Sequence, residues 1–278
     1  MKKWLSTSPG TLIHEMRELL PFWYTVFTRR ITQMNETKIK YGNSSRQYFL
    51  FFLPHHQPIT QKNIIIYFHG GGWSLGKPEY FRAHAWQFVQ RGYAVVMPSH
   101  RRIPRFSHRD MREDLILLLQ QLEKVVGEHQ WTGQHLILGG TSSGGTLAAH
   151  LAFDDTIVSQ LKTRLRGLFL LSAPLDLSKM KMTPVLRAYI GNNLDEASLN
   201  SFCPMHTDLP ILLIHGKKDA IVEHESSASF VQQLKDNQCT NIQFHSLPEG
   251  IHLDASRWGY EDNKVRQWLL NWIHQQNK

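Results

Sequence analysis

Residues 140–145 read GTSSGG, and this stretch decides the fold. It follows the apolar run LIL at 136–138 and precedes TLAAHLA at 146–152, which is rich in small and helix-forming residues. That order predicts a strand, a sharp turn and a helix. In a Gly-x-Ser-x-Gly turn the glycines lack a Cβ, so the strand and the helix can pass close to an exposed serine. The spacing predicts Ser142 as a nucleophile, with the Ser143 amide at a helix N-terminus where negative charge is favoured.

The same six residues also fit an ordinary strand–helix turn with helix-capping serines. The choice between a catalytic and a structural turn therefore depends on the rest of the sequence. Apolar runs without polar alternation are typical of strands buried on both faces of a parallel sheet. Five such runs occur, at 64–68, 93–97, 136–138, 168–171 and 211–214. Helical patterns lie between the early runs, at 80–90 and 110–126, and this alternation predicts an α/β fold with a mostly parallel, doubly wound sheet and helices on both faces. A hairpin at 37–53, a strand at 242–247 and a closing helix at 263–274 complete the pattern.

The N-terminal segment precedes the first strand signal. Apolar residues recur at helical spacing between residues 10 and 30, and Pro21 is expected to break or restart that helix. We interpret the segment as a lid or packing arm. Its aromatic residues at 22–27 could face a substrate or pack on the body of the protein, and the sequence leaves both open.

A glycine-rich loop, HGGGW at 69–73, follows the first buried run. Consecutive glycines let backbone N–H groups turn toward a ligand, and loops of this kind supply half of the oxyanion hole in lipases and esterases. We therefore expect the amides of Gly71, Gly72 and Ser143 to form an oxyanion hole, with Trp73 at the substrate. A merely flexible glycine loop is the alternative.

An acidic residue follows the run at 211–214. Asp219 lies just past that strand, where a carboxylate can hold an imidazole in one tautomer. It could instead cap the helix that starts near residue 224. Glu223 and Glu225 are nearby competitors for the catalytic role.

A histidine follows the last predicted strand. His252 lies in a loop, with a glycine two residues before it, and comes third in the chain after Ser142 and Asp219. Most of the 16 histidines are expected to be structural or solvated. His245, the competitor within the strand, should face a surface of the sheet.

Composition excludes several classes of protein. The chain has 278 residues, of which 41% are hydrophobic and 19% charged, so one large α/β domain with a sizeable core is expected. A net charge of +8 comes from scattered basic residues, without a recognisable nucleic-acid module. No run is long enough for stable membrane insertion, and no histidine or cysteine spacing suggests a metal site. The two cysteines, Cys203 and Cys239, form no disulfide framework, which favours a cytoplasmic protein.

Together these motifs resemble the hormone-sensitive-lipase-like branch of the α/β hydrolases, over about residues 60–275. The order Ser142, Asp219, His252 is that of the α/β-hydrolase triad. The family often has a Tyr-Arg-Leu-Ala-Pro stretch, where this chain reads HRRIP at 100–104, and Ser143 departs slightly from the alanine of its usual elbow. The resemblance implies an N-terminal helical cap at 1–36 and an α/β-hydrolase domain at 37–278.

The resemblance also implies a function. It indicates a carboxylesterase that acts on small-molecule esters of short to medium acyl groups through an acyl-enzyme, without a cofactor or metal. Arylformamidases of the kynurenine-formamidase type have similar motifs and cleave an N-formyl amide, so an amide substrate is the alternative. A third reading is an inactive homologue that binds a small ligand. A homodimer through an edge strand or the final helix is compatible with the sequence.

Overall fold

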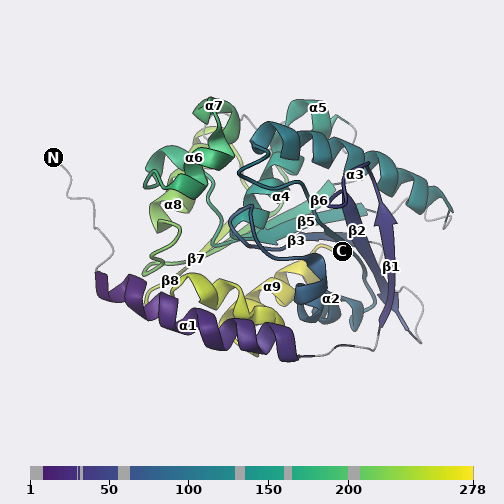
Figure 1. The fold of residues 1–278 in the computed structure, drawn as a ribbon, viewed down its shortest axis with the longest axis horizontal. Coiled ribbons are helices and arrows are strands. Elements are labelled where there is room, and N and C mark those ends of the chain that lie inside the picture. Colours follow the sequence, from purple (N-terminus) through teal and green to yellow (C-terminus); the bar gives the residue numbers. More distant parts are fainter. Residues whose placement is uncertain are drawn as a thin grey trace.

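A mostly parallel sheet of eight strands runs through the computed structural model, which describes residues 9–29, 31, 34–55, 63–128, 135–159, 165–199 and 207–277 (Figure 1). The strand order is β1-β2-β4-β3-β5-β6-β7-β8. β2 pairs antiparallel with β1 and with β4, and the pairs from β4 onward are parallel. The sheet therefore gathers the carboxyl ends of its parallel strands at one edge, where sites form in such folds.

The expected elements are present. The five buried runs lie in β3 to β7, and the hairpin, the late strand and the closing helix are β1–β2, β8 and α9. The strands are β1 (Met34–Lys40), β2 (Tyr48–Pro54), β3 (Asn63–Phe68), β4 (Ala94–Pro98), β5 (His135–Thr141), β6 (Leu165–Leu171), β7 (Ile211–Gly216) and β8 (Ile242–Leu247). The α-helices are α1 (Pro9–Thr28), α2 (Arg82–Val89), α3 (His108–Glu128), α4 (Ser143–Phe153), α5 (Asp155–Val158), α6 (Pro184–Ile190), α7 (Leu194–Ala197), α8 (His224–Asp236) and α9 (Lys264–Gln275). Short 3-10 helices are η1 (Pro78–Phe81), η2 (Leu177–Lys179), η4 (His252–Ala255) and η5 (Arg257–Gly259).

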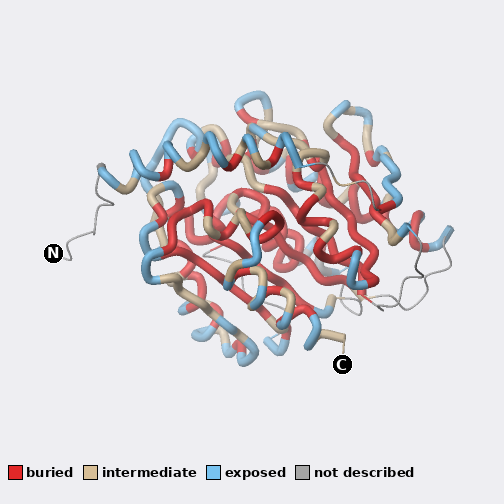
Figure 2. The backbone as a smooth tube through the Cα atoms, turned by 90° about the horizontal axis from the view of Figure 1, so that it is seen from below, coloured by how far each residue is buried: buried red, intermediate tan, exposed pale blue. Residues whose placement is uncertain are grey.

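Helices cover both faces of the sheet. Successive residues of a strand point to opposite sides, and in the central strands the side chains on both sides are apolar. In β3, Ile64 and Ile66 pack into a cluster with α3, α4 and α8, while Ile65 and Tyr67 pack into a second cluster with α1, α2 and α9. Figure 2 shows the result as a buried interior with exposed residues at the periphery. The fold is thus the three-layer α/β arrangement expected from the sequence.

The prediction that Pro21 breaks the N-terminal helix was wrong, since α1 is continuous through this residue. A proline removes one backbone donor, here the partner of the Arg17 carbonyl. Both residues are exposed, so water can satisfy that carbonyl. Buried side chains on each side of the proline, Glu15 and Phe22 among them, hold the helix against the body. The division into a cap at 1–36 and a domain at 37–278 stays a prediction.

Among the residues that the structure describes, no helix is both long enough and apolar enough to cross a membrane.

Candidate active site

The predicted turn at Ser142 is present between β5 and α4. Ser142 has φ 54° and ψ −132°, a conformation that costs a non-glycine residue ~1–3 kcal/mol. A Cβ on Gly140 would lie 2.4 Å from the Gly144 carbonyl carbon, and one on Gly144 would lie 2.3 Å from the Phe68 oxygen. Both positions therefore require glycine, because β5, α4 and β3 pass too close together for a side chain.

The structure brings the three predicted residues into one hydrogen-bonded chain. His252 Nδ1 lies 2.7 Å from Asp219 Oδ2, and His252 Nε2 lies 2.9 Å from Ser142 Oγ. An ionised carboxylate only accepts hydrogen bonds, so Nδ1 carries the proton and Nε2 of the neutral ring accepts from the serine hydroxyl. This is the geometry that a base needs to activate a nucleophile.

The acid is held by its own loop. Asp219 is 2% exposed, and its Oδ1 accepts hydrogen bonds from the amides of Ile221 at 3.0 Å and Val222 at 2.8 Å. His215 Nε2 lies 3.1 Å from Oδ2, so two imidazoles share this oxygen. Burial opposes ionisation, but the charge of His252 and hydrogen bonds from both histidines outweigh it and hold the pKa of Asp219 well below its usual range. The carboxylate therefore stays charged across the physiological range.

The competing residues lie elsewhere. Glu223 Oε1 accepts the Lys181 amide at 3.0 Å, and Glu225 is exposed in the first turn of α8. His245 stacks on Trp268 with ring centroids 4.4 Å apart, so it faces the sheet surface as expected. None of these three joins the hydrogen-bonded chain at Ser142.

Sequence reasoning missed one residue of this site. Glu15 of α1 is fully buried, and its Oε1 accepts the His252 amide at 2.7 Å and the Ala220 amide at 3.2 Å. One carboxylate thus ties the histidine loop to the acid loop. The signal was available, because Glu15 shares one helical face with Leu19 and Phe22 at i, i+4 and i+7 spacing. An acidic residue in an apolar stripe indicates a buried partner.

These contacts set the protonation of the histidine. Burial alone lowers the pKa of His252, but the charge and hydrogen bond of Asp219, followed by the charge of Glu15, raise it above the ordinary value. A raised pKa makes the ring a stronger proton acceptor when it is neutral.

The glycine loop lies directly against the elbow. A Cβ on Gly70 would be 3.2 Å from the Ser142 Cβ. Gly71 and Gly72 have φ of 143° and 58°, which L side chains rarely adopt. Their amides donate none of the backbone hydrogen bonds found outside helices and strands in the described residues. The Ser143 amide is the first of α4 and has no partner within the helix.

Trp73 lies at the end of this loop but is buried. Only 4% of it is exposed, and its ring stacks on Tyr189 with centroids 3.9 Å apart. It therefore supports the loop from within the core, and a direct contact with substrate stays a prediction.

The segment at 100–104, where the chain departs from the pattern it resembles, also braces the loop. The Arg101 amide and Nε each lie 2.7 Å from the carboxylate of Asp114, which is 1% exposed. Two residues on, the Ile103 amide donates to the Trp73 carbonyl at 3.3 Å.

No cluster of three or more candidate metal ligands occurs among the residues with a described position.

Known proteins are similar to this chain in sequence. The BD-FAE family model matches residues 51–234, well over half of the chain. An esterase of Gibberella moniliformis is 24% identical over 234 residues, covering 81% of this chain and 72% of that protein. Kynurenine formamidase of Danio rerio is 25% identical over 173 residues, or 60% of this chain, and the match spans only 54% of the formamidase.

Solved esterase structures have the same fold. Esterase B from Lactobacillus rhamnosis, with a C6-C4 SN3 inhibitor, superposes with a TM-score of 0.74 at 17% identity, covering 96% of this chain and 94% of that one. Esterase 2 of Thermogutta terrifontis, phosphonylated by sarin, gives 0.67 at 19% identity, with 88% and 95% covered. With the family match, these likenesses show that the chain belongs to the BD-FAE family and has the α/β-hydrolase fold.

Proposed function

We propose that this protein is a carboxylesterase, a serine hydrolase that cleaves esters of short to medium acyl groups through an acyl-enzyme. The hydrogen-bonded chain from Asp219 through His252 to Ser142 Oγ, with distances of 2.7 and 2.9 Å, is the observation that carries the proposal. The similarity to the esterase of Gibberella moniliformis supports it. A serine, histidine and aspartate joined by hydrogen bonds in this way perform nucleophilic acyl transfer without a metal or cofactor.

The reaction has two halves. Ser142 Oγ attacks the ester carbonyl while His252 Nε2 takes its proton, and the protonated ring then gives that proton to the departing alcohol. Water enters and attacks the acyl-serine with the same histidine as base. Asp219 holds the imidazole in the required tautomer and stabilises its charged form.

The negative charge that develops on the carbonyl oxygen needs donors. The amides of Gly71, Gly72 and Ser143 are the proposed oxyanion hole, and each such donor is typically worth ~10²–10³ in rate. The Ser143 amide lies at the N-terminus of α4, so the positive end of the helix dipole also stabilises the negative charge.

A formamidase is the second candidate, because kynurenine formamidase of Danio rerio is among the relatives and the same three residues can cleave an N-formyl amide. An inactive ligand-binding homologue is disfavoured, since all three catalytic positions are filled and hydrogen-bonded. A cytoplasmic location and a homodimer stay predictions, which cell fractionation and size-exclusion chromatography test.

The deciding experiment compares hydrolysis of p-nitrophenyl acetate, butyrate and octanoate with that of N-formylkynurenine. Wild type, Ser142→Ala and the exposed-turn control Ser45→Ala are measured together. We expect ester turnover, highest with the shorter acyl groups, that disappears only in Ser142→Ala. Faster cleavage of the formamide would move the assignment to the second candidate, and ester turnover retained by Ser142→Ala would refute the mechanism.

A further inference from the structure

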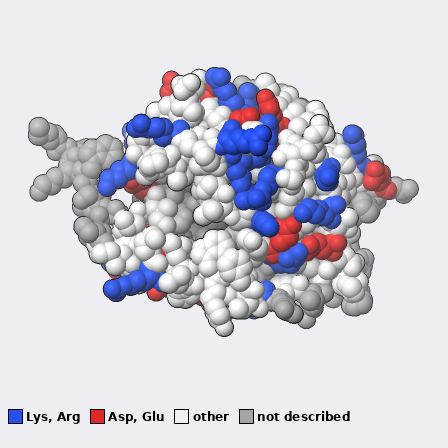
Figure 3. Space-filling view, in the orientation of Figure 1, with Lys and Arg blue, Asp and Glu red and all other residues white. Residues whose placement is uncertain are grey.

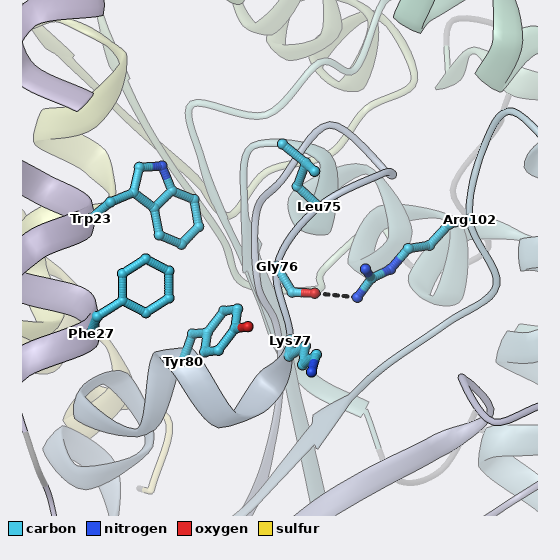
Figure 4. A pocket seen from close by; sticks show the side chains of 7 residues that line it. All are labelled: Trp23, Phe27, Leu75, Gly76, Lys77, Tyr80 and Arg102. Carbon is cyan, nitrogen blue, oxygen red and sulfur yellow. Dashed lines mark hydrogen bonds between the residues drawn. The ribbon is translucent and has the colours of Figure 1, made fainter. Parts of the chain in front are cut away.

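A pocket of about 310 Å³ lies between α1 and the loop that continues from the predicted oxyanion glycines (Figure 4). This volume falls at the lower end of the ~300–1,000 Å³ typical of ligand sites. Trp23 and Phe27 come from α1, and Tyr80 comes from η1. The other lining residues are Leu75, Gly76, Lys77 and Arg102.

Aromatic rings form one side of this pocket. Trp23 and Phe27 stack with centroids 5.4 Å apart, and Tyr80 meets Phe27 edge-on at 5.0 Å. Phe27 is nevertheless 60% exposed, so its ring is available to a ligand. Three grouped rings that remain accessible favour a flat, aromatic ligand group over an aliphatic chain.

Two cations form the other side. Arg102 donates to the carbonyls of Ser74, at 3.4 Å, and of Gly76, which fixes the guanidinium at the pocket wall. Lys77 Nζ lies 5.8 Å from the Tyr80 ring centroid. In the part of the chain that the structure describes, no carboxylate lies within ion-pair distance of either cation.

Cations predominate around the pocket. Burial and then the charge of Arg46 lower the pKa of Arg102, so a third cation lies near. Figure 3 shows Lys and Arg side chains gathered in a band to the right of the centre of the drawn face, with Asp and Glu side chains beside its lower end. The charge of Glu79 acts on Arg102, but this carboxylate is already hydrogen-bonded by Tyr48 and Lys38.

The pocket adjoins the predicted catalytic machinery through the backbone. The amides of Ser74 and Leu75 both donate to the Gly71 carbonyl, so the pocket wall is one tight turn from the proposed oxyanion donors. We propose that this pocket binds an aryl group bearing a carboxylate, as a part of the substrate. The statement that this ligand is part of the substrate rests on the proposed function. The statement that the pocket binds an aryl carboxylate does not.

The test measures binding to Ser142→Ala by titration calorimetry, with 3-phenylpropionate as the probe. The uncharged 3-phenylpropionamide and the non-aromatic 3-cyclohexylpropionate are the comparison ligands. We expect the amide to bind roughly tenfold more weakly, because it lacks a charge-assisted hydrogen bond. The cyclohexyl compound should lose roughly fivefold, because it lacks ring contacts.

Variants locate the binding. Phe27→Ala should weaken binding roughly fivefold, whereas Tyr24→Ala, an exposed aromatic of the same helix outside the pocket, should not. Lys77→Gln should weaken only the carboxylate, by about threefold, as expected for a partly exposed cation. Lys124→Gln, an exposed lysine of α3, is its control.

Two outcomes overturn the inference: equal binding of the acid and its amide, or binding that Phe27→Ala and Lys77→Gln leave unchanged. A protein that binds phenylpropionate as expected but hydrolyses no ester or formamide would refute the proposed function alone. Ester turnover without carboxylate-dependent binding would refute the pocket alone.

Discussion

Glu15 is predicted to be a positioning residue, because its carboxylate joins the two loops that carry Asp219 and His252. Its Oε1 accepts the His252 amide at 2.7 Å and the Ala220 amide at 3.2 Å, and the side chain is fully buried. Glu15→Ala leaves both amides without an acceptor. The His252 amide is buried, and a buried donor without a partner costs ~1–3 kcal/mol if its loop does not move, whereas the part-buried Ala220 amide adds less.

We expect the two loops to shift so that the amides find other partners. The variant should then lose part of its free energy of unfolding and part of its activity. A displacement of about 1 Å at a catalytic group can cost ~10²-fold in rate. Glu15→Ala should therefore lower kcat by roughly 10- to 100-fold with a smaller change in KM. Glu15→Gln keeps the accepting oxygen and should retain most of the activity. Since the charge of Glu15 raises the pKa of His252, Glu15→Gln should also move the acidic limb of activity to lower pH.

The assay is steady-state hydrolysis of p-nitrophenyl butyrate from pH 5 to 9, with thermal unfolding of each variant. Glu18→Gln is the matched control, because Glu18 lies on the same helix and contacts Arg257 instead of the catalytic loops. A Glu15→Ala variant that is folded and has unchanged kcat would refute the reasoning. So would Glu15→Gln and Glu15→Ala with the same loss, because the accepting oxygen would then be irrelevant.

Three further predictions follow from the same contacts. Activity requires neutral His252, whose pKa is raised, so kcat/KM should fall as pH drops through a value above the ordinary ~6.5, and a limb below that value would contradict the account. Asp219→Asn should lower kcat by ~10⁴-fold and move that limb to lower pH, as the charge that raises the histidine pKa is lost; a rate–pH profile tests both. Gly144→Ala places a Cβ 2.3 Å from a backbone oxygen and should destabilise the fold by ~1–3 kcal/mol in urea unfolding, whereas Gly127→Ala, with no atom within 4 Å, should not destabilise it.

Local patterns predicted most of the fold. The apolar runs of β3 to β7 are buried, and continuous apolar runs of this kind are typical of strands covered on both faces of a parallel sheet. The elbow was predictable because its geometry tolerates only glycine at 140 and 144. The meeting of Ser142, Asp219 and His252 in space was predictable because each follows a parallel strand, and those strand ends lie at one edge.

Long-range contacts were harder to predict. Glu15 reaches an amide 237 residues away, and no local pattern specifies that partner. The continuity of α1 through Pro21 likewise depends on tertiary packing of buried residues on both sides of the proline. Trp73 was expected at the substrate, but its burial against Tyr189 follows from α6, a helix that the sequence pattern did not predict.

The central claim is that Ser142 is the nucleophile of an acyl-transfer site. The most direct measurement is peptide mapping by mass spectrometry after reaction with a fluorophosphonate. We predict one adduct, on Ser142, that forms rapidly in wild type, slowly in His252→Gln and not at all in Ser142→Ala. Folded protein that forms no adduct, or an adduct on another residue that persists in Ser142→Ala, would contradict the account.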